Sequence, residues 1–120
     1  MAVVTLAVQT INQDAVDPTP VALDATSYAD GNIFTNNGKT FLWVVNDSAD
    51  TNCTVTVVCV NPCNYGTLHH VTEVVAFGTD KMIGPFQTAR YNDSAGKTTV
   101  TYAGGFTPAD VSVAALALSI

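Results

Sequence analysis

The clearest strand signal in the sequence is the segment Lys39-Thr-Phe-Leu-Trp-Val-Val-Asn46. It is rich in β-branched and aromatic residues, which favour strands, and the tight-turn dipeptide Asn37-Gly38 comes just before it. Side chains two residues apart point to the same side of a strand, so Phe41, Trp43 and Val45 share one face. We expect this segment to form a strand that buries Phe41 and Trp43 in the core.

The same kind of pattern recurs along the chain, as short runs separated by Gly, Pro, Asn and Asp. The other expected strands cover residues 3–10, 21–26, 51–60, 68–77, 81–86, 98–103 and 110–118. About eight short strands at regular spacing, with no convincing helix, predict an all-β fold. We therefore expect one antiparallel β-sandwich, or a jelly-roll-like barrel, over residues 1–120, in which residues 1–20 could include an extended N-terminal arm.

The composition fits such a domain and argues against several classes of function. Hydrophobic residues make up 48% of the chain and charged residues 12%, against a usual charged share of about 25%, so neither disorder nor a helical bundle is expected. The net charge is −6 and the cations Lys39, Lys81, Arg90 and Lys97 are scattered, which disfavours binding to nucleic acid or to a membrane. No apolar run predicts a membrane span or a secretory signal, so we expect a soluble protein made inside a cell.

The three cysteines, Cys53, Cys59 and Cys63, cannot form a fully paired disulfide framework, because their number is odd. Cys53 and Cys59 fall in one expected strand, which holds their Cα atoms too far apart for a bridge. A bridge from Cys63 to either of them stays open, because Asn61-Pro62 can turn the chain. The cysteine spacing fits a zinc site poorly, so we expect no metal.

The residues that could support catalysis form no recognisable motif. His69 and His70 are adjacent, so they would point to opposite sides of a strand. A nucleophile at Cys63 or Ser48, with His69 as the base and Asp80 to orient it, has no supporting local pattern. We therefore expect no catalytic residues, no cofactor and no enzyme activity.

Two loop features are weaker candidates for ligand binding. Asp47 and Asp50 could hold calcium, but their segment lacks the EF-hand pattern, so a plain turn is favoured. A sugar-binding platform could use the aromatic residues in or near expected loops, Tyr28, Phe34, Tyr65 and Phe106. We favour the simpler interpretation, in which these rings pack beneath their own loops.

The C-terminal part of the sequence carries a more specific pattern. Its pieces are, in order, Ile83-Gly-Pro-Phe86, Ala89-Arg-Tyr-Asn-Asp93, Gly96, Val100-Thr-Tyr102 and a closing strand over residues 111–118. Together with the strand at residues 38–46, this order resembles the small decoration, or cement, proteins of tailed bacteriophages. The resemblance covers residues 38–118, and residues 59–70 form an insertion relative to it.

The resemblance implies a structural, non-enzymatic virion protein that is made in the host cytoplasm and lies on the capsid surface. Its partner would be the major capsid protein of the assembled head, which it would stabilise, and it would bind as a homotrimer at local three-fold positions. Residues 2–10 could add a strand to the edge of a partner's sheet. Two other functions stay open: a structural role at the head–tail neck or in the tail, and a carbohydrate-binding module.

The residues that carry the resemblance also have a physical interpretation. Gly84-Pro85 predicts a bend and the end of a strand ladder. Phe86 and Tyr91 could then seal one end of the sandwich, and Arg90 could pair with Asp93 or a neighbouring acid. These positions are typical of a framework rather than of a binding site.

Overall fold

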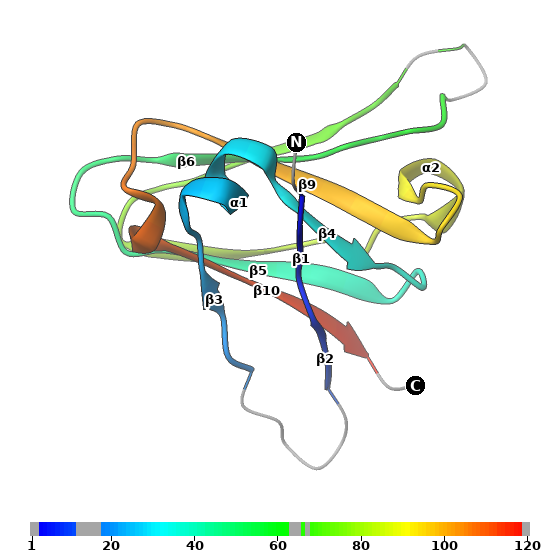
Figure 1. Cartoon of the computed structure of the whole chain (residues 1–120), viewed down its shortest axis with the longest axis horizontal. Helices are drawn as coiled ribbons and strands as arrows, with labels where there is room; N and C mark the ends of the chain where they lie inside the picture. Colours follow the sequence, from blue (N-terminus) through cyan, green and yellow to red (C-terminus); the bar gives the residue numbers. More distant parts are fainter. Residues whose placement is uncertain (1–2, 12–17, 63–65, 67, 119–120) are drawn as a thin grey trace.

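The structure is a computed structural model that describes residues 3–11, 18–62, 66 and 68–118. Its strands are β1 (Val4–Thr5), β2 (Val8–Ile11), β3 (Val21–Ala22), β4 (Asn32–Thr35), β5 (Thr40–Asn46), β6 (Cys53–Val57), β7 (Val71–Val75), β8 (Thr79–Ile83), β9 (Lys97–Ala103) and β10 (Val111–Leu118) (Figure 1). Its helical segments are α1 (Ala25–Asp30), α2 (Thr88–Tyr91) and the 3-10 turn η1 (Pro108–Asp110). None of the helices in these residues is long and apolar enough to cross a membrane.

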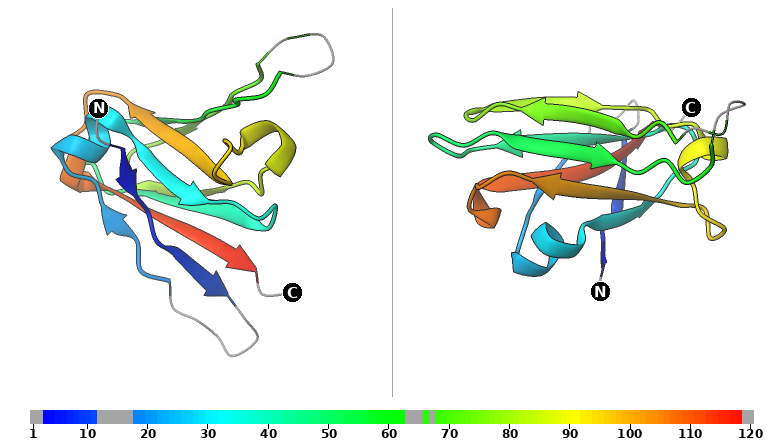
Figure 2. Two further views of the ribbon diagram at one scale, coloured as in Figure 1. Left: turned by 45° about the vertical axis from the view of Figure 1, so that its right-hand side comes forward. Right: turned by 90° about the horizontal axis from the view of Figure 1, so that it is seen from above.

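The strands form two sheets with a shared core, which confirms the expected all-β sandwich (Figure 2). The first sheet has the order β1-β4-β9-β6-β7, and the second has the order β2-β10-β5-β8, with β3 also pairing with β10. Most pairs are antiparallel, as expected, but β1 runs parallel to β4 and β2 runs parallel to β10. Both sheets are therefore mixed, which corrects the purely antiparallel expectation.

The N-terminal segment belongs to both sheets. β1 pairs with β4 in the first sheet, and β2 pairs with β10 in the second. Between these strands Leu6 is only 5% exposed, and its N–H donates to the carbonyl of Ile33 at 2.8 Å. Residues 4–5 and 8–11 thus pair within the protein as edge strands of the two sheets, and the addition of this segment to a partner's sheet stays a prediction. Of the expected arm, residues 1–2 and 12–17 lie outside the described residues.

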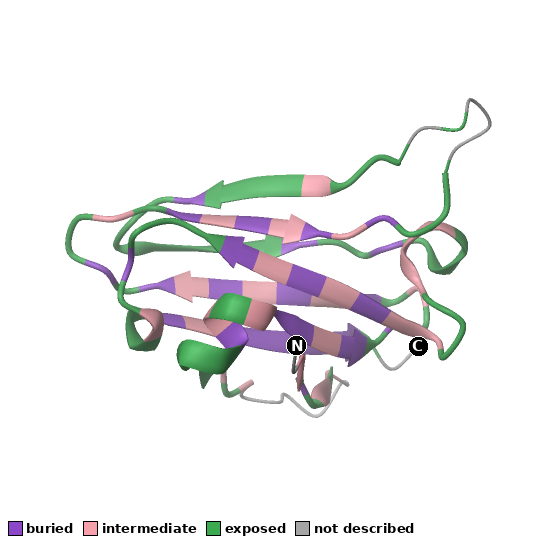
Figure 3. Ribbon diagram, turned by 45° about the horizontal axis from the view of Figure 1, so that its top comes forward, coloured by how far each residue is buried: buried purple, intermediate pink, exposed green. Residues whose placement is uncertain are grey.

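The core lies between the sheets and follows the alternation of the strands (Figure 3). On β6 the buried side chains are Cys53, Val55 and Val57. On β5, however, Leu42 and Val44 have 0% exposure and face the core. Phe41 and Trp43, which were expected in the core, lie on the opposite face of the strand and point outward.

Two segments differ in type from their expected structure. Residues 21–26, expected as one strand, contain only β3 and the start of α1. The carboxylate of Asp24 accepts from the N–H of Ser27 (2.8 Å), and the Ser27 hydroxyl accepts from the N–H of Asp24 (2.9 Å). This capping box starts the helix, and the bond from the Ser27 N–H lowers the pKa of Asp24 because it stabilises the charged form. Residues 88–91, where no helix was expected, form helix α2.

One side of the sandwich is left open by two edge strands, β7 of the first sheet and β8 of the second. Glu73 on β7 is the cross-strand partner of Val55, and Lys81 on β8 is the partner of Val44, so both charged side chains lie on the core side. The Lys81 Nζ and a carboxylate oxygen of Glu73 lie 3.6 Å apart across this opening. Inward-pointing charges of this kind discourage pairing of a sheet edge with another chain.

Candidate functional site

The structure does not bring the candidate catalytic residues together. The Ser48 hydroxyl lies in the β5–β6 connection, where it accepts from the N–H of Thr51 at 3.1 Å. Asp80 on β8 binds Trp43 instead of a histidine. The carbonyl of His69 accepts from the Tyr91 hydroxyl near α2. The bonds of Ser48 and Asp80 in the described residues thus go to groups other than His69, in line with the lack of a supporting sequence pattern.

The second histidine has a structural contact with a cysteine. The Nδ1 atom of His70 accepts from the backbone N–H of Cys59 at 2.9 Å, while the Cys59 thiol donates to the carbonyl of Asn61 at 3.1 Å. Both bonds fix the chain between β6 and β7. Because the thiol points at a carbonyl rather than at the imidazole, this pair does not form a Cys–His catalytic dyad.

The cysteines in the described residues, Cys53 and Cys59, are buried and free. Burial raises the pKa of Cys53 to about 11, because the thiolate would lose its hydration. It also raises the pKa of Tyr102, whose hydroxyl donates to Asn32 Oδ1 at 2.7 Å in the core. Cys63 lies outside the described residues, which contain no group of three His, Cys, Asp or Glu side chains able to hold a metal ion.

The Asp47–Asp50 segment is a turn held by its own polar groups. Asp50 Oδ1 accepts from the Thr51 hydroxyl at 2.8 Å, and Asn46 Oδ1 accepts from the N–H of Ser48 at 3.0 Å. The Asn46 amide also donates to the carbonyls of Thr51 and Val75, both at 3.0 Å. This confirms the interpretation of the segment as a turn.

Three of the four aromatic residues considered for a sugar-binding platform lie in the described residues, and they pack against the protein. Phe34 lies on β4, a strand that was not expected, and has 0% exposure. Phe106 is also buried, and its ring centroid lies 4.7 Å from that of Tyr28. These three rings pack inside the protein, as the simpler interpretation predicted, and Tyr65 lies outside the described residues.

The residues of the phage-like pattern form a framework at one end of the sandwich. The Phe86 ring is buried, with centroids 6.1 Å from Phe34 and 5.8 Å from Tyr91, so these rings close the end as predicted. The expected pairing of Arg90 with Asp93 is not found among the described residues. The Asp93 carboxylate instead accepts from two backbone N–H groups, those of Ala95 and Lys97.

The outer faces of the two sheets differ in chemistry. On the first sheet, the register places one row of threonines across β7, β6 and β9, namely Thr72, Thr56 and Thr101. Further outward threonines on this sheet are Thr35, Thr54 and Thr99. The same face also carries Ile33, Val74 and Ala103, so it is mostly polar, as on the solvated side of an ordinary sandwich.

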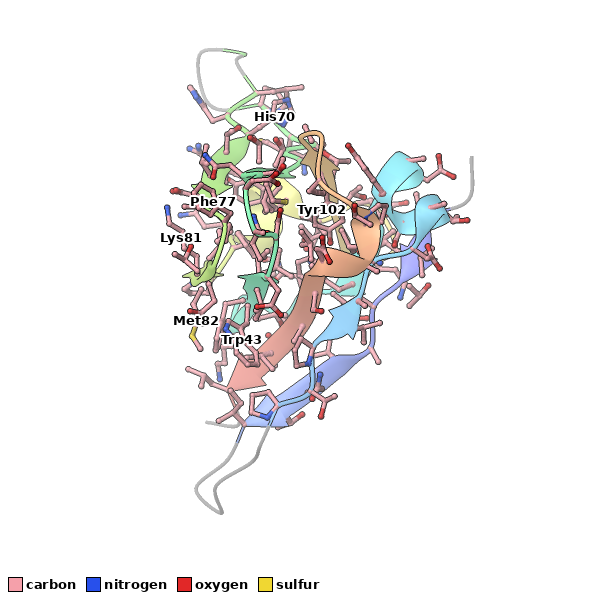
Figure 4. All side chains as sticks on the ribbon, turned by 90° about the vertical axis from the view of Figure 1, so that its left-hand side faces the viewer. Trp43, His70, Phe77, Lys81, Met82 and Tyr102 are labelled. Atoms are coloured by element: carbon pink, nitrogen blue, oxygen red, sulfur yellow. The ribbon has the colours of Figure 1, made fainter. Side chains whose placement is uncertain are left out.

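On the second sheet most of the corresponding positions are apolar, and the polar exceptions are Asp80 and Ser112, the two cross-strand partners of Val45. Trp43 on β5 lies between Met82 on β8 and Ala114 on β10, and Phe41 lies beside Leu116. With Val45 these residues form the Trp43 face, defined as Phe41, Trp43, Val45, Met82, Ala114 and Leu116. Met82 is 64% exposed and the three β5 side chains are half-buried, so the centre and the β8 edge of this face are open to solvent, whereas Ala114 and Leu116 on β10 are buried. Figure 4 shows Trp43 and Met82 next to each other at the same side of the molecule.

The polar atom of Trp43 is already satisfied within the protein. Its indole Nε1–H donates to Asp80 Oδ2 at 2.7 Å, and Asp80 is the cross-strand partner of Val45. The bond fixes the indole against the sheet and leaves its ring for apolar contact. The strand pattern correctly placed Phe41, Trp43 and Val45 on one face but wrongly assigned that face to the core.

Comparison of the chain with protein-family models, with curated proteins and with solved structures found no match in any of the three.

Proposed function

We propose that the protein is a structural component of a tailed-bacteriophage particle that binds the outer surface of the assembled capsid through its Trp43 face. The observation that carries this proposal is the contrast between the two outer faces of the sandwich. One face has threonine rows, whereas the other has Phe41, Trp43 and Met82 at equivalent positions. The ordered motifs between residues 83 and 102, which resemble decoration proteins, supply the class of partner.

The chemistry of the Trp43 face suits a protein partner. Its nearest charge, Asp80, is already bonded to Trp43, so little polar surface has to lose water when a partner covers the face. Aromatic residues and methionine are enriched in protein interfaces, where a few anchors supply most of the binding free energy. Full burial of a side chain such as Met82 contributes about 1.5–3 kcal/mol, which corresponds to at least about a tenfold change in affinity.

The test compares two substitutions at exposed positions on opposite faces. Met82→Asp places a charge on the Trp43 face, and Val74→Asp places one on the threonine face, where Val74 is 46% exposed. Both variants and the unmodified protein are mixed with empty shells assembled from a major capsid protein encoded in the same genome, and binding is measured by cosedimentation. We expect Met82→Asp to lose at least tenfold in affinity and Val74→Asp to bind as the unmodified protein does.

The same experiment identifies the results that would overturn the proposal. If the unmodified protein did not bind the shells, or if the Met82→Asp variant bound them equally well, binding through the Trp43 face would be excluded. Mass spectrometry of purified particles adds the copy number. Many copies per particle support decoration, whereas a few copies would overturn it in favour of a neck or tail component.

A further inference from the structure

Charge in the described residues is divided between the two ends of the sandwich. One end, formed by the connections β5–β6, β7–β8 and β9–β10, carries the aspartates Asp47, Asp50, Asp80 and Asp110. Helix α1, which packs on the β9–β10 connection, adds Asp24 and Asp30. Figure 4 looks onto this acidic end. Lys39, Arg90 and Lys97 lie at the opposite, basic end, in the β4–β5 turn, α2 and the start of β9 (Figure 1).

The remaining charges do not cancel this division. Lys81 is paired with Glu73 on the open side of the sandwich, away from either end. Asp93 is the one acid that the described residues place at the basic end, and its carboxylate is occupied by backbone N–H groups. The acidic end therefore lacks a cation among the described residues, and the basic end keeps an excess of them.

The acidic end presents a small projecting loop, residues 47–50, whose shape is fixed (Figure 1). Asp47 and Asp50 are exposed, whereas Ser48 is buried and holds the turn through bonds to its neighbours. The N–H of Asp47 donates to the carbonyl of Asp110 at 2.8 Å, which ties the loop to η1. Two carboxylates are thus held on a rigid backbone with no cation beside them in the described part of the chain.

The basic end presents a pocket that is lined in part by a cationic side chain. An open pocket of about 390 Å³ is lined by Val71, Pro85, Phe86, Gln87, Arg90 and Tyr91. The carbonyl of Arg90 accepts from the N–H groups of Val60 (2.9 Å) and Asn61 (3.1 Å), which fixes its backbone. Its guanidinium has no hydrogen bond or ion pair within the described residues. A guanidinium above a partly apolar pocket fits a carboxylate on a short side chain.

We propose that copies of this chain associate head to tail, with the Asp47–Asp50 loop of one copy seated in the Arg90 pocket of the next. The two surfaces are different patches at different ends of the protein, so the contact is heterologous and repeats. Such a contact closes into a ring if the rotation between copies permits it, and otherwise grows into a chain. The inference does not depend on capsid binding, because the loop and the pocket lie outside the Trp43 face.

The net charge of the whole chain, −6, makes the copies repel one another at long range. At contact distance the local charges dominate, because screening limits each charge to about 8–10 Å at ordinary salt. Association through the two ends is therefore expected to weaken as salt concentration rises. Attraction driven by the Trp43 face alone would show little salt dependence or would strengthen.

A charge-exchange experiment tests the contact directly. The first variant, Arg90→Glu, makes the pocket negative and leaves the loop intact. The second, Asp47→Lys with Asp50→Lys, makes the loop positive and leaves the pocket intact. Each variant alone brings like charges together at the contact, whereas a mixture restores opposite charges at every contact. Association is measured by sedimentation velocity over a range of protein and salt concentrations, with Val74→Glu on the threonine face as the matched control.

We expect the unmodified protein and the Val74→Glu control to associate at low salt, and each charge variant alone to associate at least tenfold more weakly. The mixture of the two variants should recover association. A monomeric unmodified protein, or a mixture that stays monomeric while the control associates, would overturn the head-to-tail contact. Failure of shell binding would leave these results unchanged, so the two proposals are tested separately.

Discussion

The indole Nε1–H of Trp43 donates a 2.7 Å hydrogen bond to the carboxylate of Asp80 on the neighbouring strand, so the one tryptophan of the chain is held on the outer side of its sheet. Its sequence neighbour Leu42 points into the core with 0% exposure. Adjacent residues of β5 thus have opposite roles, one in stability and the other on the surface.

This placement predicts different costs for two neighbouring truncations. Leu42→Ala should lower the free energy of unfolding by about 2–5 kcal/mol, because it leaves a cavity in the core. Trp43→Ala should cost about 1–2 kcal/mol, because the ring is only half-buried and no cavity forms. Urea unfolding followed by circular dichroism measures both variants. A larger loss for Trp43→Ala than for Leu42→Ala would place the indole in the core.

The ion pair on the open side predicts a change in solubility with little change in stability. Replacing Glu73 and Lys81 together by threonine removes the inward charges from both edge strands, and we expect association through these edges, visible as rising light scattering. The exchanged variant, Glu73→Lys with Lys81→Glu, keeps the charges and should stay dispersed. The unfolding free energy should change by less than about 1 kcal/mol, because the pair is half-exposed. Equal scattering by both variants would contradict this role.

The buried Cys53 thiol predicts a loss of stability at alkaline pH. Its pKa rises from 9.0 to about 11 on folding, so between these values the unfolded chain releases a proton that the folded chain retains. The unfolded state is therefore favoured as pH rises, by up to about 2–3 kcal/mol near pH 11. Urea midpoints measured across this range should fall, and Cys53→Ala should flatten the decline. Tyr102, buried beside it, adds a loss in the same direction. If the urea midpoints of Cys53→Ala fell with pH as those of the unmodified protein do, the loss of stability would come from another group.

Two glycines with positive φ predict unequal tolerance of a side chain. A Cβ at Gly31 (φ +85°) would lie 2.4 Å from the carbonyl oxygen of Val100, whereas one at Gly78 (φ +71°) would meet nothing within 4 Å. Gly78→Ala should cost about 1–2 kcal/mol from backbone strain alone. Gly31→Ala should cost clearly more, because α1 and β9 must also move apart. Thermal unfolding compares the two, and equal costs would show that the close approach relaxes easily.

The strand pattern predicted the class of fold because alternation and turn residues are local signals. It placed most of β5, β6, β9 and β10 correctly within a few residues. It failed on the orientation of β5, because both faces of that strand carry apolar side chains. Asn46 adds to this ambiguity. A polar residue at a strand end suggests that its face of the strand points outward, yet the Asn46 amide is buried and donates to the carbonyls of Thr51 and Val75.

Other features depend on contacts that no short window of sequence contains. Whether Arg90 pairs with Asp93 depends on the turn that uses the Asp93 carboxylate for its own N–H groups. The apolar Trp43 face likewise appears only when Met82 is brought beside Trp43 by strand register. The start of α1 is an exception, because Asp24 followed three residues later by Ser27 is a local capping signal.

The parallel pairing of β2 with β10 joins a strand near the start of the described chain to its last strand, and it has a mechanical consequence. If the two ends of the chain were pulled apart, Val8–Ile11 would slide along its partner in the opposite direction. The hydrogen bonds between these strands lie across that direction, so the load would fall on all of them at once rather than on one at a time. The N-terminal segment that links the two sheets therefore also resists shear between the two ends of the described chain.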